Sequence, residues 1–335
     1  YPIEAQDSYQ QAIAESFNKD STLIHVGISI FDNGYFKIAY NLFTLLLPKV
    51  GKDWTEGFAY LARCCYELNK TEEYKKIWNA AKAELALRAV LKAYGAKGFT
   101  TNFDDLGDVN VEETGHGFDP IPGLASQRLM SEGIGFGAEG DWKSAALYRT
   151  TWFMSQGLEG GTSFLEDYTL NFDGENTSIL EAHMLEINPD IAEEKPRLEV
   201  HFLGIGYRKS KTARLVFTSK QGHGVTATIV DMGNRFRLIV NDVNLIKSKP
   251  LPKLPVASAL WVPEPSFEVG VGCWINAGGT HHSCFSFGLT DEYWRDFAEI
   301  ADVEACIINK DTDYEQFRKE LKFNEIYYML NKALR

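Results

Sequence analysis

The sequence lacks the features that direct a protein into a membrane or onto nucleic acid. No apolar run approaches the length of a membrane span, and the longest candidate, residues 42–50, contains Pro48 and Lys49. Basic residues are outnumbered, because 34 Lys and Arg against 46 Asp and Glu leave a net charge of -12. Nucleic acid and anionic membranes both favour a basic surface, so the composition argues against either as the main partner.

Secretion signals and metal-type cysteine spacings are lacking as well. The chain shows no signal peptide, although it begins at Tyr1 rather than Met. Its five cysteines are an odd number without zinc-type spacing, which fits free thiols in a reducing compartment. What is present is an ordinary globular composition, with 44% hydrophobic and 24% charged residues in a chain of 335. We therefore expect a cytoplasmic protein of two or three domains with a large core.

Residues 1–79 are predicted to form a helical segment. Helical periodicity covers residues 21–47 and 54–81, and each stretch is broken by a short polar turn. Small residues recur beside aromatic ones, as in Gly34-Tyr35-x-x-Ala39-x-x-x-Phe43. This pattern resembles tetratricopeptide helix pairs, in which small residues pack against aromatic ones. An unrelated helical bundle is the alternative interpretation.

Residues 80–160 show an alternating α/β pattern. Helical periodicity covers residues 82–94, 124–132 and 143–154, and the stretches at 98–103 and 134–138 are typical of short strands. Open α/β sheets place ligands where a strand ends and a helix begins. We predict a truncated open α/β domain of the flavodoxin-like kind here.

Residues 161–335 are predicted to be mostly β. The stretches 197–203, 213–219, 225–231 and 236–241 alternate apolar and polar residues between turn residues. Their spacing suits a meander that curls into a barrel, and helices are expected at the end of the chain. The predicted fold class is therefore α/β plus β, with a helical N-terminal segment and a C-terminal β-barrel domain.

Four side chains combine donor chemistry with tight, apolar surroundings. Glu139 stands beside a predicted helix start, and Glu166 belongs to an acidic pair between aromatic residues. His183 lies at the edge of an apolar segment, and His282 follows a glycine pair. Two carboxylates and two imidazoles suit Mn²⁺ or a close relative. Each residue alone also has an ordinary explanation, because a glutamate can stabilise a helix start and a histidine can be a hydrogen-bonded core residue.

His281 and His282 are adjacent, so the direction in which each side chain points decides which of them can serve a site. Neighbouring residues of a strand point to opposite faces of the sheet. At most one of the two can then serve a given site.

From residue 80 to the end, the sequence resembles the L-arabinose isomerases. About three quarters of the chain carries the resemblance, with many uncommon motifs in order. Among them are PGLASQRLM at 122–130, GFGAEGDWK at 135–143, GGTSFLEDY at 160–168, HMLE at 183–186 and AGGTHH at 277–282.

The resemblance implies an aldose–ketose isomerase that converts L-arabinose to L-ribulose, with D-galactose as a poorer substrate. In that family two glutamates and two histidines hold a divalent metal, usually Mn²⁺ and otherwise an ion such as Co²⁺ or Mg²⁺. By resemblance the ligands are Glu139, Glu166, His183 and His282, while His281 points elsewhere. The two glutamates would also move a proton between C1 and C2 through a cis-enediol, and the metal would polarise the carbonyl.

Two further properties follow from the resemblance alone. Phe103 and His282 match substrate-binding positions, so the expected partner is a small sugar. Family members are homo-oligomers, trimers or hexamers, and the same is expected here.

The sequence also departs from the family pattern. Residues 1–79 stand where family members have an α/β domain, and early strands of the central sheet are missing. The loop at 108–119 is longer, and its His116 could reach the pocket. We divide the chain into 1–79, 80–160 and 161–335. A non-catalytic, metal-binding interaction protein, made of an isomerase remnant and helical repeats, is the alternative function, and a wrongly joined reading frame is a third interpretation.

Overall fold

The chain folds into two units that interleave along the sequence. The computed structural model describes residues 20–46, 56–68, 71–103, 106, 118–119, 121–172, 177–203, 210–248 and 251–333. The first unit comprises 1–95, 102–132 and 195–216, and the second comprises 96–101, 133–194 and 217–335. The expected division at residues 79 and 160 stays a prediction.

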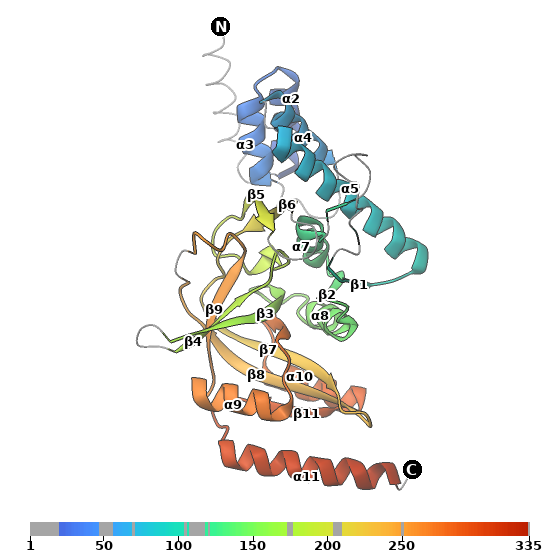
Figure 1. The fold of residues 1–335 in the computed structure, drawn as a ribbon, viewed down its shortest axis with the longest axis vertical. Helices are drawn as coiled ribbons and strands as arrows, with labels where there is room; N and C mark the ends of the chain where they lie inside the picture. The colour runs from blue at the N-terminus through green and yellow to red at the C-terminus, as the bar shows by residue number, and fades with distance from the viewer. Residues whose placement is uncertain are drawn as a thin grey trace. The chain divides into compact units, whose positions relative to one another are not determined.

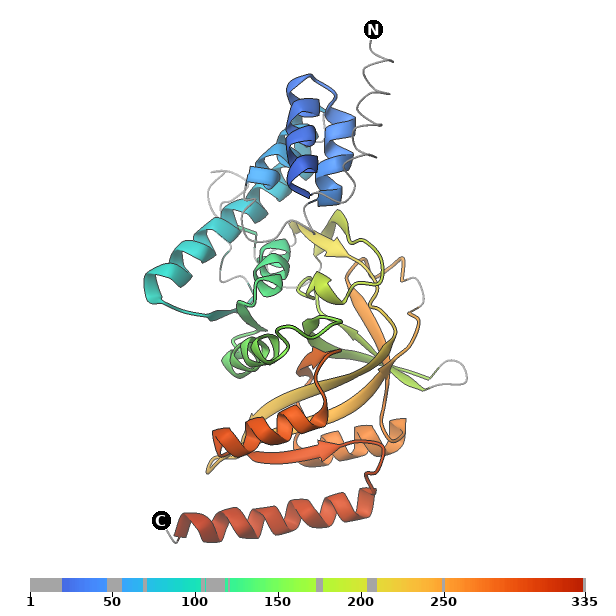
Figure 2. The same ribbon diagram turned by 180° about the vertical axis from the view of Figure 1, so that it is seen from behind.

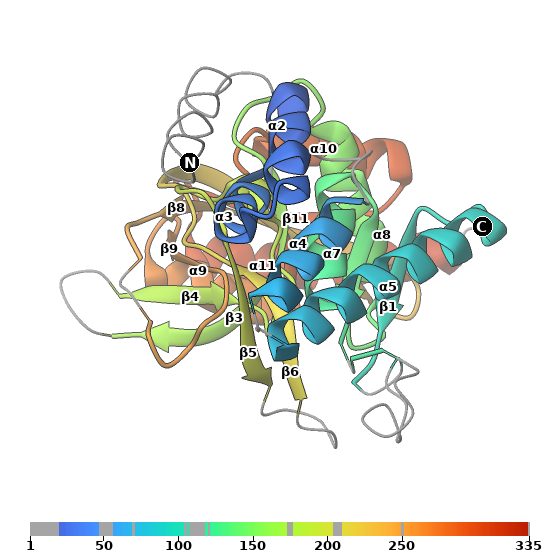
Figure 3. The ribbon, with the colours of Figure 1, turned by 90° about the horizontal axis from the view of Figure 1, so that it is seen from above.

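Four helices make up the N-terminal part of the first unit. Each packs on the next in chain order, as Figure 3 shows: α2 (Asp20–Asp32), α3 (Phe36–Leu46), α4 (Glu56–Glu67) and α5 (Thr71–Tyr94). The predicted turn after residue 32 is present, with Gly34 at a φ of 79°. A Cβ on Gly27 would lie 2.6 Å from the Phe43 ring, so this small residue allows close packing of α2 on α3. Within the described residues of 1–79 the predicted helices are present, and α5 continues without a break to residue 94.

The first unit is completed by α7 (Gly123–Ser131) and a two-stranded ribbon, β5 (Arg197–Leu203) and β6 (Ser210–Val216). The Gln127 side chain pairs with the backbone of Leu215, accepting from its N–H at 2.8 Å and donating to its carbonyl at 3.1 Å. The expected meander is therefore wrong for these two strands, because they pair only with each other among the described strands. Alternation of apolar and polar residues indicates that one face of a strand is buried, but it does not identify the strand that pairs with it.

A parallel pair of strands opens the second unit. β1 (Gly98–Thr101) pairs with β2 (Gly135–Ala138), and α8 (Trp142–Met154) follows β2 directly. A Cβ on Gly137 would lie 2.1 Å from the carbonyl oxygen of Asp141, so only glycine allows this tight return of the chain. The wider flavodoxin-like sheet stays a prediction, since within the described residues this sheet has two strands.

The second unit is built around a closed antiparallel barrel (Figure 1). Strand order runs β8-β7-β10-β3-β4-β9, and β9 pairs back onto β8. The strands are β3 (Thr162–Asn171), β4 (Ser178–Ala182), β7 (Gly222–Asp231), β8 (Phe236–Leu245), β9 (Ser258–Pro263) and β10 (His282–Ser286). The predicted barrel is confirmed, although four of its six strands were not predicted individually.

Short helices and one further strand flank the barrel. β11 (Glu304–Ile308) runs parallel to β8. Figure 2 shows it beside α10, and the flanking elements are η1 (Pro189–Ile191), α9 (Phe267–Ala277), α10 (Asp291–Ala301) and α11 (Tyr314–Ala333). Trp274 of α9, Phe317 of α11 and Ile239 of β8 share one buried cluster. Within the described part of the chain, we find no helix with the length and apolarity needed to cross a bilayer.

Candidate metal centre

Two of the four candidate ligands lie on neighbouring barrel strands. Glu166 of β3 is directly opposite His282 of β10, and on its other side it faces Ala182 of β4. Directly opposed residues of antiparallel strands point to the same face of a sheet. His183 follows β4 immediately and is buried. Strand pairing therefore brings Glu166 and His282 to one face of the barrel, and His183 joins them from the end of β4.

Glu139 reaches this face from the turn between β2 and α8. Its φ is 58°, a left-handed conformation that is costly for a residue with a side chain, and Gly140 follows at 80°. Such strain costs on the order of 1–3 kcal/mol and persists where the surrounding structure holds it. Asp302, at the end of α10, is the other described non-glycine residue with positive φ.

The four candidate ligands are arranged in two carboxylate–imidazole pairs. Glu166 Oε2 lies 3.8 Å from His183 Nε2, and Glu139 Oε2 lies 3.9 Å from His282 Nε2. The two imidazole centroids are 5.7 Å apart. Both carboxylate–imidazole separations are too long for hydrogen bonds.

Three of these atoms are buried without a hydrogen-bond partner: Glu166 Oε2, His183 Nε2 and His282 Nε2. Buried polar atoms are nearly always satisfied, so three orphaned ones at one place call for an explanation. Ligands of one divalent ion lie roughly 2.0–2.4 Å from it and hence about 3–4.5 Å from each other. The two measured separations fall in that range, and carboxylate oxygens with imidazole nitrogens suit a borderline-hard cation. The donor chemistry of these residues therefore fits a divalent metal ion, while among the described residues the group with ligand atoms mutually within 4.8 Å is Glu139, His281 and His282.

The opposite imidazole nitrogens are both occupied. Glu186 Oε2 lies 2.6 Å from His183 Nδ1, and Asp141 Oδ2 lies 3.2 Å from His282 Nδ1. The ring of Phe164 packs against both imidazoles, with centroid distances of 5.2 and 5.1 Å. Neither acid was assigned a role from the sequence, although an Asp before a helix and a His-x-x-Glu spacing are both readable signals.

These contacts shift two pKa values. Burial alone lowers the pKa of His183, but its hydrogen bond to Glu186 and that carboxylate's charge outweigh burial and raise it. Burial raises the pKa of Asp141, yet hydrogen bonds from His282 and Ser144 hold it far below its usual range. Asp141 is therefore an ionised acceptor at neutral pH.

His281 does not point away, contrary to the sequence-based expectation. Its Nε2 lies 3.8 Å from Glu139 Oε2, and its ring is 4.1 Å from that of His282. β10 begins only at His282, so strand alternation does not apply to the residue before it. Among the described residues, Glu139, His281 and His282 offer ligand atoms within 4.8 Å of one another and could hold a metal ion.

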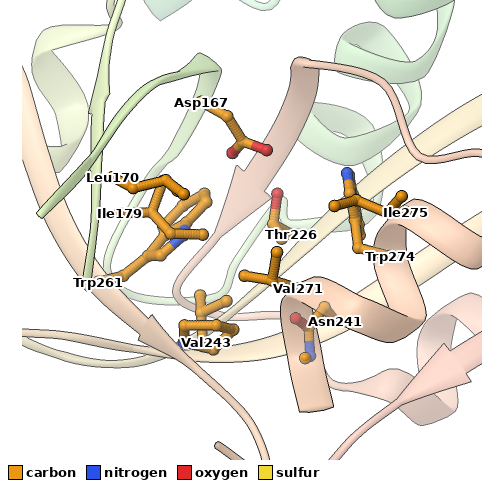
Figure 4. Close-up of a pocket in the computed structure, with 12 residues that line it drawn as sticks. Asp167, Leu170, Ile179, Thr226, Asn241, Val243, Trp261, Val271, Trp274 and Ile275 are labelled. Atoms are coloured by element: carbon orange, nitrogen blue, oxygen red, sulfur yellow. The ribbon is translucent and has the colours of Figure 1, made fainter. Parts of the chain in front are cut away.

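The inner face of the same strands lines a different cavity. Figure 4 shows Asp167 and Thr226 pointing into this space of about 160 Å³, beside Trp261 and Trp274. Loss of hydration, helped by the nearby Glu166 charge, raises the pKa of Asp167 to about 6, although a hydrogen bond with Glu181 lowers it. Glu166 and Asp167 are neighbours in β3 and so serve opposite faces.

Two further predicted residues are not part of this geometry. Phe103 lies half-buried in a turn after β1 and belongs to the first unit, so its role in a sugar pocket stays a prediction. His116 lies outside the described residues.

A closed barrel with carboxylate and imidazole donors on one outer face defines a mixed helix-and-sheet protein with a candidate divalent-metal centre. Comparison with known families gives two matches: residues 55–157 to the L-arabinose isomerase central domain and residues 161–304 to the L-arabinose isomerase C-terminal domain. This chain belongs to the L-arabinose isomerase family. The first match begins before α4, earlier than the residue 80 that the motifs predict, and α2 and α3 lie outside both matches.

Individual relatives agree with these matches. The L-arabinose isomerases of Phocaeicola vulgatus and Bacteroides thetaiotaomicron are each 74% identical to this chain over 268 residues, which is 80% of the chain and 52% of each relative. That of Herpetosiphon aurantiacus is 51% identical over 264 residues, 78% of the chain and 51% of the relative. The chain thus spans about half the length of the curated relatives it matches.

Proposed function

We propose that this chain carries the metal-binding half of an aldose–ketose isomerase that converts L-arabinose to L-ribulose through a cis-enediol. Family membership supports the reaction. The observation that carries the proposal is the set of three orphaned, buried donor atoms on Glu166, His183 and His282. Buried polar atoms usually have a partner, and here the three meet at one place on facing acid and imidazole groups.

In this proposal Glu139, Glu166, His183 and His282 hold the ion, and the two glutamates also handle protons. A bound divalent cation supplies Lewis acidity that polarises the sugar carbonyl. One carboxylate would accept the proton at C2 of the open-chain sugar and return it to C1, while the other would carry the hydroxyl proton from O2 to O1. The exposed position of Glu139 and the partial exposure of Glu166 leave both reachable from solvent, as a proton-transfer group must be. His282 would also contact the sugar.

The finer assignments rest on the family and are proposals too. Mn²⁺ is the proposed ion, with Co²⁺ or Mg²⁺ as substitutes, and Phe103 is proposed to line the sugar pocket. A cytoplasmic location, a homo-oligomeric state (trimer or hexamer) and a flavodoxin-like central sheet complete the proposal.

The test is isomerisation by the full chain with Mn²⁺. We expect L-ribulose to form from L-arabinose, to stop when the ion is chelated, and to fall by about 10²–10⁴ in Glu166→Gln. Glu292→Gln, on the exposed face of α10, is the matched control and should leave the rate unchanged. Because the relatives are about twice as long, activity of this chain alone is expected to be weak, and a separately expressed N-terminal domain of a relative should raise it.

Tight Mn²⁺ binding without turnover of any aldopentose or aldohexose, even with that added domain, would contradict the enzyme. The alternative function, a metal-binding interaction protein, would then stand, with the helices α2 to α5 as its partner-binding part.

A further inference from the structure

Two carboxylates outside the proposed ligand set contact its imidazoles on the side away from the orphaned nitrogens. Glu186 is fully buried and lies three residues after His183. Asp141 comes from a different element, the start of α8, and contacts His282. Both contacts are to Nδ1, and both nitrogens without a partner are Nε2.

We propose that Glu186 and Asp141 are positioning residues that fix the proton of each imidazole on Nδ1 and present Nε2 to the ion. This inference deepens the proposed function and rests on it for the identity of the ion. Neither acid is a metal ligand in it. Each acts through a histidine.

The physical reason lies in imidazole chemistry. A neutral imidazole carries one proton, and the nitrogen without it is the one that can bind a metal. In the proposed arrangement the carboxylate oxygens of Glu186 and Asp141 accept, and Nδ1 of each imidazole donates. The lone pair is then left on Nε2 in both rings. A carboxylate behind the ring also raises the basicity of the ligand and holds its orientation.

Asp141 has a second role that must be separated from this one. It caps α8, accepting from the Ser144 N–H at 3.1 Å and from the Ser144 hydroxyl at 2.6 Å. A serine at position 141 can still cap the helix but is too short to reach His282. Conversely, Ser144→Ala removes the hydroxyl contact and keeps the contact to His282. These two variants therefore separate the effect of losing a helix-cap contact from the effect of losing the contact to the His282 imidazole.

The two positioning contacts differ in strength. The Glu186 contact is 2.6 Å and completely buried, whereas the Asp141 contact is 3.2 Å with a partly exposed carboxylate. A short, buried, charge-assisted hydrogen bond is the stronger kind. The loss of Glu186 should therefore weaken metal binding more than the loss of the Asp141 contact.

The experiment combines two readouts on the full chain. The first is ¹⁵N NMR of histidine-labelled, metal-free protein at alkaline pH, which reports the nitrogen that carries the proton. We expect Nδ1–H on His183 and His282 in the parent, loss of that preference at His183 in Glu186→Ala, and loss at His282 in Asp141→Ser. Ser144→Ala should keep both.

The second readout is Mn²⁺ affinity by calorimetry. We expect a fall of about 10–100-fold in Glu186→Ala and in Asp141→Ser, with partial recovery in Glu186→Gln and Asp141→Asn, which retain an acceptor oxygen. Affinity within twofold of the parent in both, with the proton still on Nδ1, would overturn the inference. If Glu186→Ala fails to fold, the inference is tested with Glu186→Gln, Asp141→Ser and Asp141→Asn. If the parent binds no Mn²⁺, the metal part of the proposed function fails, while the NMR readout still tests the positioning.

Discussion

Two buried ionic clusters in the second unit differ in whether their hydrogen bonds are complete. In the first, Glu304 accepts from Arg235 at 2.6 Å and from Arg237 at 2.9 Å through one oxygen, and from Asn324 at 2.9 Å through the other. Glu325 accepts one further hydrogen bond from each arginine, at 2.8 and 2.9 Å. This cluster joins β8, β11 and α11, and Glu304 has a partner for each oxygen.

The candidate metal centre is the second cluster, and its hydrogen bonds are incomplete. The contacts of Glu186 and Asp141 to the imidazoles are made, while buried atoms on Glu166, His183 and His282, and Oε1 of Glu186, have no partner. In a network that stabilises the fold, the charged groups satisfy one another's hydrogen bonds. In a ligand-binding network, some polar atoms have no partner until the ligand binds. The comparison therefore distinguishes groups that hold the fold from groups that hold an ion.

Breaking the complete cluster should have the largest effect on stability. Glu304→Ala takes from two buried guanidinium groups their buried carboxylate and leaves them the half-exposed Glu325. Removal of one partner from a buried charge network costs about 3–5 kcal/mol. Urea unfolding followed by tryptophan fluorescence measures it. Glu325→Ala is the matched control and should cost at most about 1 kcal/mol, because that side chain is 50% exposed. Equal losses of unfolding free energy in the two variants would show that the buried Glu304 contributes no more to stability than the half-exposed Glu325.

Completing the open cluster with metal should have the next largest effect. A ligand that binds only the folded state stabilises it by about 2.7 kcal/mol when free ligand exceeds Kd a hundredfold. We expect Mn²⁺ to raise the unfolding free energy of the parent by this amount, measured by the same urea titration.

Glu166→Gln should lose most of that gain, because it removes a charged donor from the site. Glu304→Gln, in the complete cluster, serves as the comparison and should keep it, although its metal-free stability is lower. A parent chain that gains nothing from Mn²⁺ would mean that the orphaned atoms do not form a metal centre.

The smallest effect concerns the strained turn of Glu139. Glu139→Gly relieves a left-handed conformation that costs about 1–2 kcal/mol, while glycine gives the unfolded chain about 0.4–1 kcal/mol of added entropy. We expect a net stabilisation of about 0.5 kcal/mol, seen in urea unfolding, together with weaker Mn²⁺ binding.

Asp302→Gly relieves the same backbone conformation far from the proposed ligands in sequence and should leave Mn²⁺ binding unchanged. Destabilisation in Glu139→Gly without any change in metal affinity would assign Glu139 a structural role.

Local patterns predicted the helices and the existence of a barrel, but not which strands form it. Periodicity located α8 well, because its buried residues lie on one face, and it predicted that helices end the chain. β10, with all five residues buried, gives no alternation that a pattern could detect. β5 and β6 do alternate, yet they pair outside the barrel, because pairing depends on contacts distant in sequence.

For the candidate site, residue chemistry and family motifs led to the four proposed ligands. They did not predict the acids behind the imidazoles, because the Asp141–His282 contact joins positions far apart in sequence. The position of His281 beside Glu139 was also missed, since it depends on where β10 begins. The ligand set itself stays a prediction that metal binding must test.

The strand order also determines when the centre can assemble during synthesis. Glu166 and His183 belong to one local hairpin, β3 with β4, so their pairing requires only a short loop closure. His282 begins β10, which inserts between β3 and β7 and is made last of the six barrel strands. Distant pairings of this kind form late. A nascent chain on the ribosome therefore holds three of the four proposed donors until β10 emerges with His282, and barrel closure and full metal affinity are acquired in the same step.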